Sequence, residues 1–71
     1  MPQLIAKQLI KILEENGFVF IRQNGSHWIF KNFKNNITVP VPIHGKNNPI
    51  YKGTLSIIIK QSKLSKEKFA K

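Results

Sequence analysis

The chain has 71 residues, which allows one small domain, and it contains no cysteine. Disulfides, thiolate metal sites, iron–sulfur clusters and a thiol nucleophile are therefore excluded. Twelve Lys and Arg residues against three Asp and Glu residues give a formal net charge of +9. Such an excess of positive charge indicates a polyanionic partner.

The basic residues favour contact with a phosphate backbone over the reading of bases. All of them except Arg22 are lysines, and lysine binds phosphate as a point charge, whereas bidentate base recognition usually relies on arginine. We therefore expect binding with weak sequence choice. The alternative is that a biased base composition has enriched the chain in Lys, Asn and Ile.

No segment has the pattern of a membrane span or a signal peptide. The chain has no apolar run of the required length, and its first residues lack a basic stretch followed by an apolar one. We therefore expect a cytoplasmic protein that consists of a single domain over residues 1–71.

The first periodic segment predicts a helix from about residue 3 to residue 16. Its apolar residues recur at the spacing of one helical stripe: Ile5, Leu9, Ile12 and Leu13. Pro2 suits a first helical turn, and Gly17 can adopt the left-handed conformation that ends a helix.

Three strands are predicted next. Residues 18–23 are β-branched and aromatic, the turn Asn24-Gly25-Ser26 follows, and residues 27–31 form a second strand. A third strand covers residues 37–41, and Pro40 and Pro42 indicate that it is either an edge strand or one that ends in an extended, proline-determined segment. Period-2 alternation puts four aromatic residues on the inner face: Phe18, Phe20, Trp28 and Phe30. The opposite face then carries His27, Ile29 and Lys31.

A second helix is predicted to open at Gly53-Thr54-Leu55, with Thr54 as its N-cap. Its inner stripe consists of Leu55, Ile58, Ile59 and Ser62. Residues 57–59 are three isoleucines and could also form a strand, but the spacing of the stripe favours a helix. Ser65 can cap a short final turn from Lys66, with Phe69 packing back onto the domain.

These elements give the fold class α+β, in the order α-β-β-β-α with a short final helix. Strands linked by hairpins form a three-stranded antiparallel sheet, and two helices with apolar stripes must cover one face of it.

The candidate catalytic residues are few. Aspartate is absent, and the two histidines and three glutamates show no metal-ligand spacing, so we expect no metal and no cofactor. Imidazole can act as a general base or acid near neutral pH. Because RNA supplies its own nucleophile, the 2′-hydroxyl, one histidine together with cations that stabilise the phosphorane is sufficient for strand cleavage. A solvent-exposed structural histidine is the alternative.

Three segments carry a resemblance to the HicA toxin family of mRNA interferases. The first is Gly25-Ser26-His27 with its flanking strands, the second runs from Thr38 to Gly45, and the third is Lys52-Gly53-Thr54-Leu55 with the helix that follows. They occur in the order typical of the family and cover nearly the whole chain. The resemblance implies a fold like that of a double-stranded-RNA-binding domain. It also implies an mRNA substrate, a HicB-type antitoxin partner and a catalytic histidine at His27.

The site residues form a hypothesis around His27. Gly25 would allow close backbone approach, and Ser26 could offer a hydrogen bond to a phosphate oxygen, although both are also ordinary hairpin residues. His44 could complete a base and acid pair with a bell-shaped pH–rate profile, or it could have no role. Further candidate RNA-binding residues are Arg22, Lys31 and Lys52.

Three functions remain open at this point. The first is a metal-independent endoribonuclease toxin, the second is a non-catalytic RNA-binding module, and the third is an interaction protein whose charge serves an acidic partner.

Overall fold

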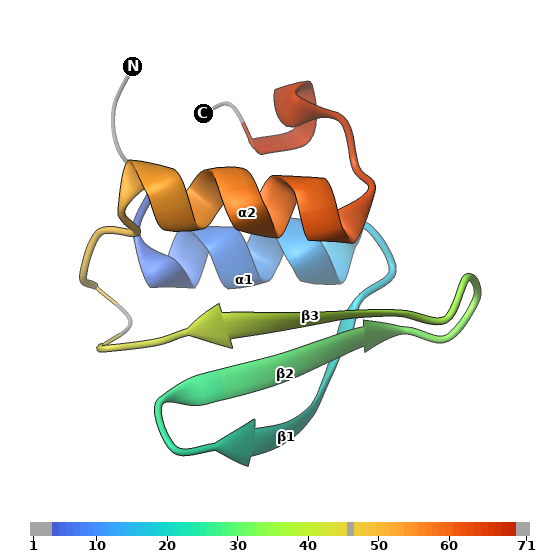
Figure 1. Cartoon of the computed structure of the whole chain (residues 1–71), viewed down its shortest axis with the longest axis horizontal. Coiled ribbons are helices and arrows are strands. Elements are labelled where there is room, and N and C mark those ends of the chain that lie inside the picture. The colour runs from blue at the N-terminus through green and yellow to red at the C-terminus, as the bar shows by residue number, and fades with distance from the viewer. Residues whose placement is uncertain (1–3, 46, 70–71) are drawn as a thin grey trace.

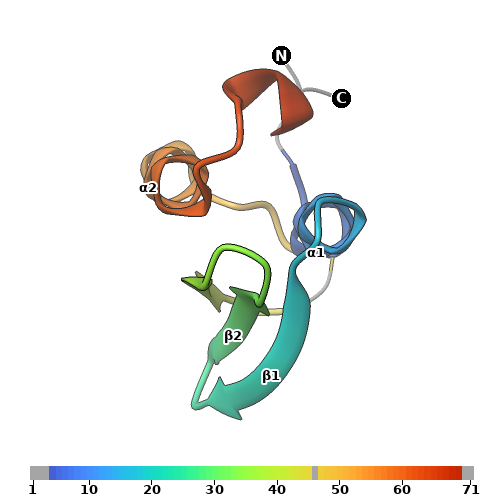
Figure 2. The ribbon, with the colours of Figure 1, turned by 90° about the vertical axis from the view of Figure 1, so that its right-hand side faces the viewer.

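A computed structural model describes residues 4–45 and 47–69. Two helices lie over one face of a three-stranded antiparallel sheet, in the order α-β-β-β-α (Figure 1). This is the α+β fold of the double-stranded-RNA-binding type that the sequence predicts. Figure 2 shows both helices nearly end-on, side by side above the sheet. Within the described ranges, no helix has the length and apolarity that crossing a membrane requires.

Helix α1 spans Ala6–Glu15 and is shorter at its start than the sequence predicts. Residues 4 and 5 are not helical, because the Ile50 amide donates to the Leu4 carbonyl at 2.8 Å and Ile5 forms a β-bridge with Pro49. The prediction for Pro2 concerns a residue outside the described ranges. At the other end, Gly17 has a φ of +92° and ends the helix as predicted.

The strands are β1 (Val19–Asn24), β2 (His27–Asn32) and β3 (Ile37–Pro42), in the spatial order β1-β2-β3. The first turn is one residue shorter than predicted, because Asn24 pairs with His27 and only Gly25 and Ser26 connect the strands. Gly25 has a φ of +63°, which matches a type II′ turn with glycine at its first central position. As predicted, β3 is an edge strand. Pro40, which has no amide proton, therefore does not interrupt the hydrogen bonds of a central strand.

Helix α2 spans Lys52–Ser62 and begins earlier than predicted. The Leu55 amide donates to the Tyr51 carbonyl at 2.8 Å, so Tyr51 is the N-cap and Thr54 lies within the first turn. The three isoleucines are helical, and Ile58 and Ser62 are buried. A short 3-10 helix, η1, covers Lys66–Phe69, and Phe69 is buried against the core as predicted.

The core lies between the helices and the sheet. Its fully buried centre contains residues from both layers: Leu9, Ile12, Leu13, Phe18, Phe30, Val39, Val41 and Ile58. The expectation that Phe20 is an inward residue is only partly met. Its ring lies 5.2 Å from that of Trp28 and 5.9 Å from that of Phe30, yet the residue is 46% exposed. The reason is its place on β1, the edge strand that lies farther from α2 than β2 and β3 do (Figure 1).

On the face away from the helices, Ile29 is nevertheless 8% exposed. It is not part of the main core cluster. Because β2 is the central strand, Ile29 is flanked by Arg22 on one side and Pro40 on the other. Neighbouring strands therefore shield it without any helix above.

Candidate functional site

The Gly25–Ser26 turn places His27 at the first position of β2. The residue is exposed, and its imidazole makes no hydrogen bond to another described residue. Its backbone, in contrast, is held on both sides, since its Cα partners are Asn24 in β1 and Pro42 in β3. An accessible imidazole on a fixed backbone is the arrangement that a general base requires.

The turn itself is tied to its neighbours by two further hydrogen bonds. The Ile43 amide donates to the Ser26 carbonyl at 2.7 Å, and the Gln23 side-chain amide donates to the Gly25 carbonyl at 2.9 Å. A Cβ added at Gly25 would meet no atom within 4 Å. The space around Gly25 is therefore open, and a bulky ligand can approach the backbone there.

His44 lies at the same end of the molecule as His27. The chain continues beyond β3 through Ile43, which bonds to the Gly25–Ser26 turn, and His44 follows directly. In Figure 1 the β1–β2 turn, the end of β3 and the start of α2 all lie at this end. The fold thus brings residues 25–27 and the segment of His44 together at one end of the sheet, and α2 begins with Lys52 at the same end of the molecule.

The two other predicted RNA-binding residues are placed differently. Arg22 pairs with Ile29 on the face away from the helices, and it is exposed. Lys31 lies on the same face, but it is four residues from His27 along β2, or roughly 13 Å. Its ammonium group lies 4.9 Å above the Phe33 ring, toward the opposite end of the sheet. Lys31 therefore does not join the cluster around His27.

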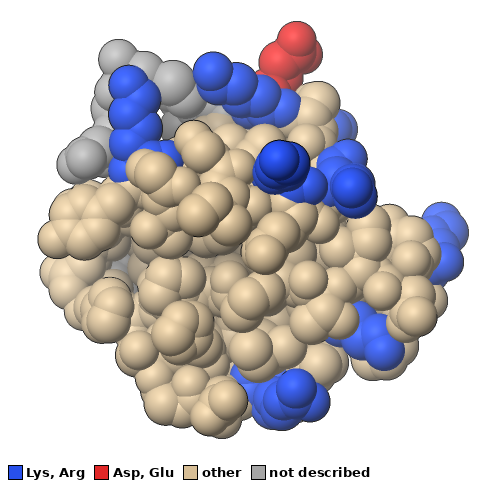
Figure 3. Space-filling view, viewed as in Figure 1, with Lys and Arg blue, Asp and Glu red and all other residues tan. Residues whose placement is uncertain are grey.

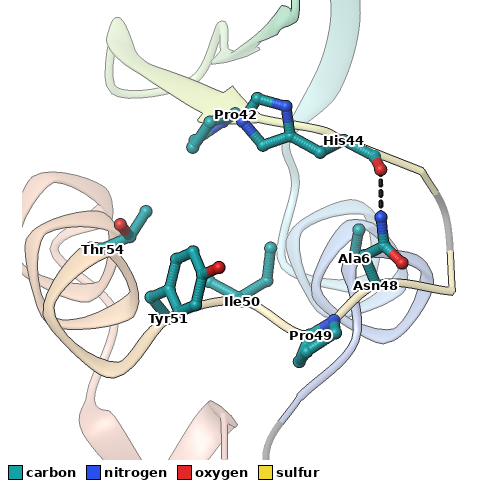
Figure 4. A pocket seen from close by; sticks show the side chains of 8 residues that line it. All are labelled: Ala6, Pro42, His44, Asn48, Pro49, Ile50, Tyr51 and Thr54. Atoms are coloured by element: carbon teal, nitrogen blue, oxygen red, sulfur yellow. Dashed lines mark hydrogen bonds between the residues drawn. The ribbon is translucent and has the colours of Figure 1, made fainter.

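A hollow of about 180 Å³ lies beside this cluster, between the segment that follows β3 and the start of α2 (Figure 4). His44 and Pro42 line one side of it, and Tyr51 and Thr54 line the other. From the sequence, no role was predicted for Tyr51, and Thr54 was predicted only to cap the helix. The available signal was the position of Tyr51, an aromatic residue directly before the Lys52-Gly53-Thr54-Leu55 motif.

Positively charged side chains predominate on the face shown in Figure 3, and they are distributed unevenly over it. Figure 3 shows Lys and Arg side chains around the margins of one face, with an uncharged area between them. Among residues 4–45 and 47–69, no group of three or more His, Cys, Asp or Glu side chains could hold a metal ion. At this end of the molecule the described side chains include the imidazoles of His27 and His44, the hydroxyls of Ser26 and Thr54 and the ammonium group of Lys52.

Comparison with known proteins identifies the family. Residues 6–64 match the family described as HicA toxin of bacterial toxin-antitoxin. The chain belongs to the HicA toxin family. The match includes β1, β2, β3 and α2 completely, and with them the Gly25-Ser26-His27 turn and the His44 loop of this HicA chain. No curated protein matches this HicA chain.

Proposed function

We propose that this HicA-family chain is an endoribonuclease that cleaves mRNA without a metal ion, with His27 as the general base. The observation that supports this best is the position of His27 at an open turn in a chain of this family. The side chain is exposed while its backbone pairs with both neighbouring strands.

The proposed reaction is an internal transesterification. The His27 imidazole removes the proton of a ribose 2′-hydroxyl, and the 2′-oxygen attacks the adjacent phosphorus atom. The bond from phosphorus to the 5′-oxygen breaks, and that oxygen takes up a proton. The products are a 2′,3′-cyclic phosphate and a 5′-hydroxyl, so no water or cofactor is consumed. Catalysis by one positioned base typically contributes about 10²–10⁴-fold to such a step.

Further groups would assist the reaction. The Ser26 hydroxyl belongs to the same turn and can donate to a phosphate oxygen, while Gly25 leaves room for the strand. Lys52 and Arg22 are exposed cations that can attract the phosphates on either side. His44, at the same end of the molecule, is the candidate donor of the proton to the leaving 5′-oxygen.

The test is cleavage of a defined mRNA by the purified chain in excess EDTA, with the His27→Ala variant beside it. We expect native cleavage to persist in EDTA and the variant to lose it. Loss of native cleavage in EDTA would instead indicate a metal-dependent reaction. RNA binding without cleavage by the native chain would favour the non-catalytic RNA-binding module, and full cleavage by the variant would remove His27 from the mechanism.

The expected partner is a HicB-type antitoxin that covers the surface around His27. We expect a stoichiometric complex in which cleavage stops. Diethylpyrocarbonate modifies exposed imidazoles. Its reaction rate at His27, measured in the free chain and in the complex, shows whether the antitoxin covers this side chain. If His27 reacted equally fast in the silent complex and in the free chain, inhibition by simple occlusion would be wrong.

A further inference from the structure

We propose that the hollow between His44 and Tyr51 is a binding site for one unpaired nucleobase of the RNA strand. This inference rests on the proposed ribonuclease function, because it gives the nucleotide beside the cleaved bond a place on the protein. Figure 4 shows the two aromatic rings on opposite sides of the hollow, carried by two segments of the chain.

The shape of the hollow suits a small flat ligand. Its volume of about 180 Å³ lies below the ~300–1,000 Å³ of pockets for drug-sized molecules. Ile50, which is 6% exposed, contributes to its apolar lining, together with Pro42. The hydroxyl of Thr54 is a polar group at the side formed by α2. An apolar site with aromatic walls and few polar groups fits the face and edge of a base.

Tyr51 is the residue on which a base would stack. It is 74% exposed, more than any other large hydrophobic residue described. Its backbone is nonetheless held, since its carbonyl accepts the first hydrogen bond of α2 from Leu55 at 2.8 Å. A base stacked on an aromatic ring gains affinity regardless of its identity, because every base has a π-face. This agrees with the weak sequence choice expected from the lysine-rich composition.

The loop that carries His44 and Asn48 is held in place by hydrogen bonds within the protein. The Ala6 amide donates to the Asn48 carbonyl at 3.0 Å, and the Asn48 side-chain amide donates to the His44 carbonyl. Ile5 and Pro49 form the β-bridge beside them. These contacts fix the loop against the start of α1, so binding a base costs little ordering of the protein.

The hollow reaches the strand pair that carries the proposed general base, although His27 itself does not line it. Pro42, which lines it, is the Cα partner of His27, and paired residues in an antiparallel ladder have Cα atoms about 4.5–5.5 Å apart. A nucleotide whose ribose lies at His27 can therefore place a neighbouring base in the hollow. Phosphate contact alone would not need an apolar site at this position.

The experiment titrates the full chain with a short single-stranded oligonucleotide whose 2′-hydroxyls carry methyl groups, so that it cannot be cleaved. Tyr51 is the sole tyrosine of the chain, and its ring protons are a separate NMR signal. We expect them to shift as the oligonucleotide binds, and not on addition of inorganic phosphate. Tyr51→Ala should weaken binding roughly 5- to 150-fold, the range for one stacked base, while Tyr51→Phe should keep it within about twofold of the native chain.

Phe33→Ala is the matched control, because Phe33 is 66% exposed and sits after β2 at the opposite end of the sheet. We expect it to bind as the native chain does. Equal losses in Tyr51→Ala and Phe33→Ala, or ring signals of Tyr51 that stay in place at saturation, would overturn the proposal. A third outcome would also overturn it: Tyr51→Ala binds the oligonucleotide as tightly as the native chain does but binds the antitoxin more weakly. That result would assign the hollow to a protein partner.

This readout is independent of cleavage. If the Tyr51 signals shift and the native chain cleaves no RNA, the ribonuclease proposal fails while the base site stands. If cleavage occurs and the signals do not move, the base site alone fails.

Discussion

His27 and Pro42 lie directly opposite one another across the β2–β3 ladder. Proline has no amide proton to donate, and the next residue, Ile43, makes the bond that closes the ladder onto the Ser26 carbonyl. Through this pair the candidate base borders the segment that carries His44. Residues separated by a whole hairpin therefore meet at one end of the sheet.

The exposure of His27 predicts that its side chain contributes little to stability. Replacement by Ala should change the free energy of unfolding by no more than about 0.5 kcal/mol, as for other exposed positions. Urea denaturation followed by circular dichroism measures the change. A large loss of stability would mean that missing cleavage in this variant reflects unfolding, and His27→Gln would then have to separate the two effects.

The turn glycine should be sensitive for a purely conformational reason. Gly25 has a φ of +63° with open space around it, so a side chain there meets strain and no clash. Gly25→Val should cost about 1–2 kcal/mol in the free energy of unfolding, and Gly25→Asn should cost less because Asn tolerates this conformation.

At Gly53, in contrast to Gly25, a side chain should stabilise the chain, and the same urea denaturation experiment measures the change. It lies in the first turn of α2 with an ordinary φ and nothing within 4 Å of an added Cβ. Gly53→Ala should therefore stabilise the chain by about 0.4–1 kcal/mol. A loss at both glycines would contradict the conformational explanation.

The centre of the core should depend strongly on one ring. Phe30 is 0% exposed and pairs with Val39 and Phe20 on the inner face of the sheet. Phe30→Ala should cost about 3–5 kcal/mol, a large part of the total stability of a domain of this size. Since a loss of this size approaches the total stability, Phe30→Leu supplies the milder comparison, and calorimetry measures the midpoint of each variant. Phe33→Ala, at an exposed position, should shift the midpoint hardly at all.

The salt dependence of RNA binding should identify which lysines touch phosphate. Binding of an oligonucleotide that cannot be cleaved should weaken steeply as salt rises, because neutralised phosphates release counterions. Lys52→Ala, at the start of α2 and at the same end of the molecule as His27, should reduce the slope of log affinity against log salt by about 0.7. Lys34→Ala, in the turn between β2 and β3, should leave it unchanged. Equal effects from the two variants would indicate diffuse attraction without a defined path for the strand.

Much of the fold was predictable from local patterns. The stripe of Leu9, Ile12 and Leu13 predicts α1, and the alternation around Trp28 and Phe30 predicts the inner face of β2. These signals are strong because burial on one side of an element leaves a period in the chain itself. The candidate base, His27, was likewise found from its motif, although its role remains a prediction.

The rest depended on contacts between distant residues. The sequence placed the start of the first helix too early, because only the pairing of Leu4 and Ile5 with residues 49 and 50 keeps them extended. The sequence predicted Thr54 as the N-cap of α2, whereas the N-cap is Tyr51, whose carbonyl accepts the first hydrogen bond of the helix. At the start of α1, a helix propensity worth a fraction of a kcal/mol was overridden by hydrogen bonds from a distant segment. At the start of α2, the deciding bond is a local one within the helix itself.

Composition and periodicity by themselves determined that this protein is a small, basic α+β domain with a histidine directly after a turn. Only the tertiary structure decided that this histidine is exposed, that His44 and Tyr51 line one hollow, and that Lys31 stands apart from His27. The physical reason is that element patterns record which side of a helix or strand is buried. They do not record which loops meet at the end of a sheet, and that depends on strand register and on hydrogen bonds between segments far apart in the chain.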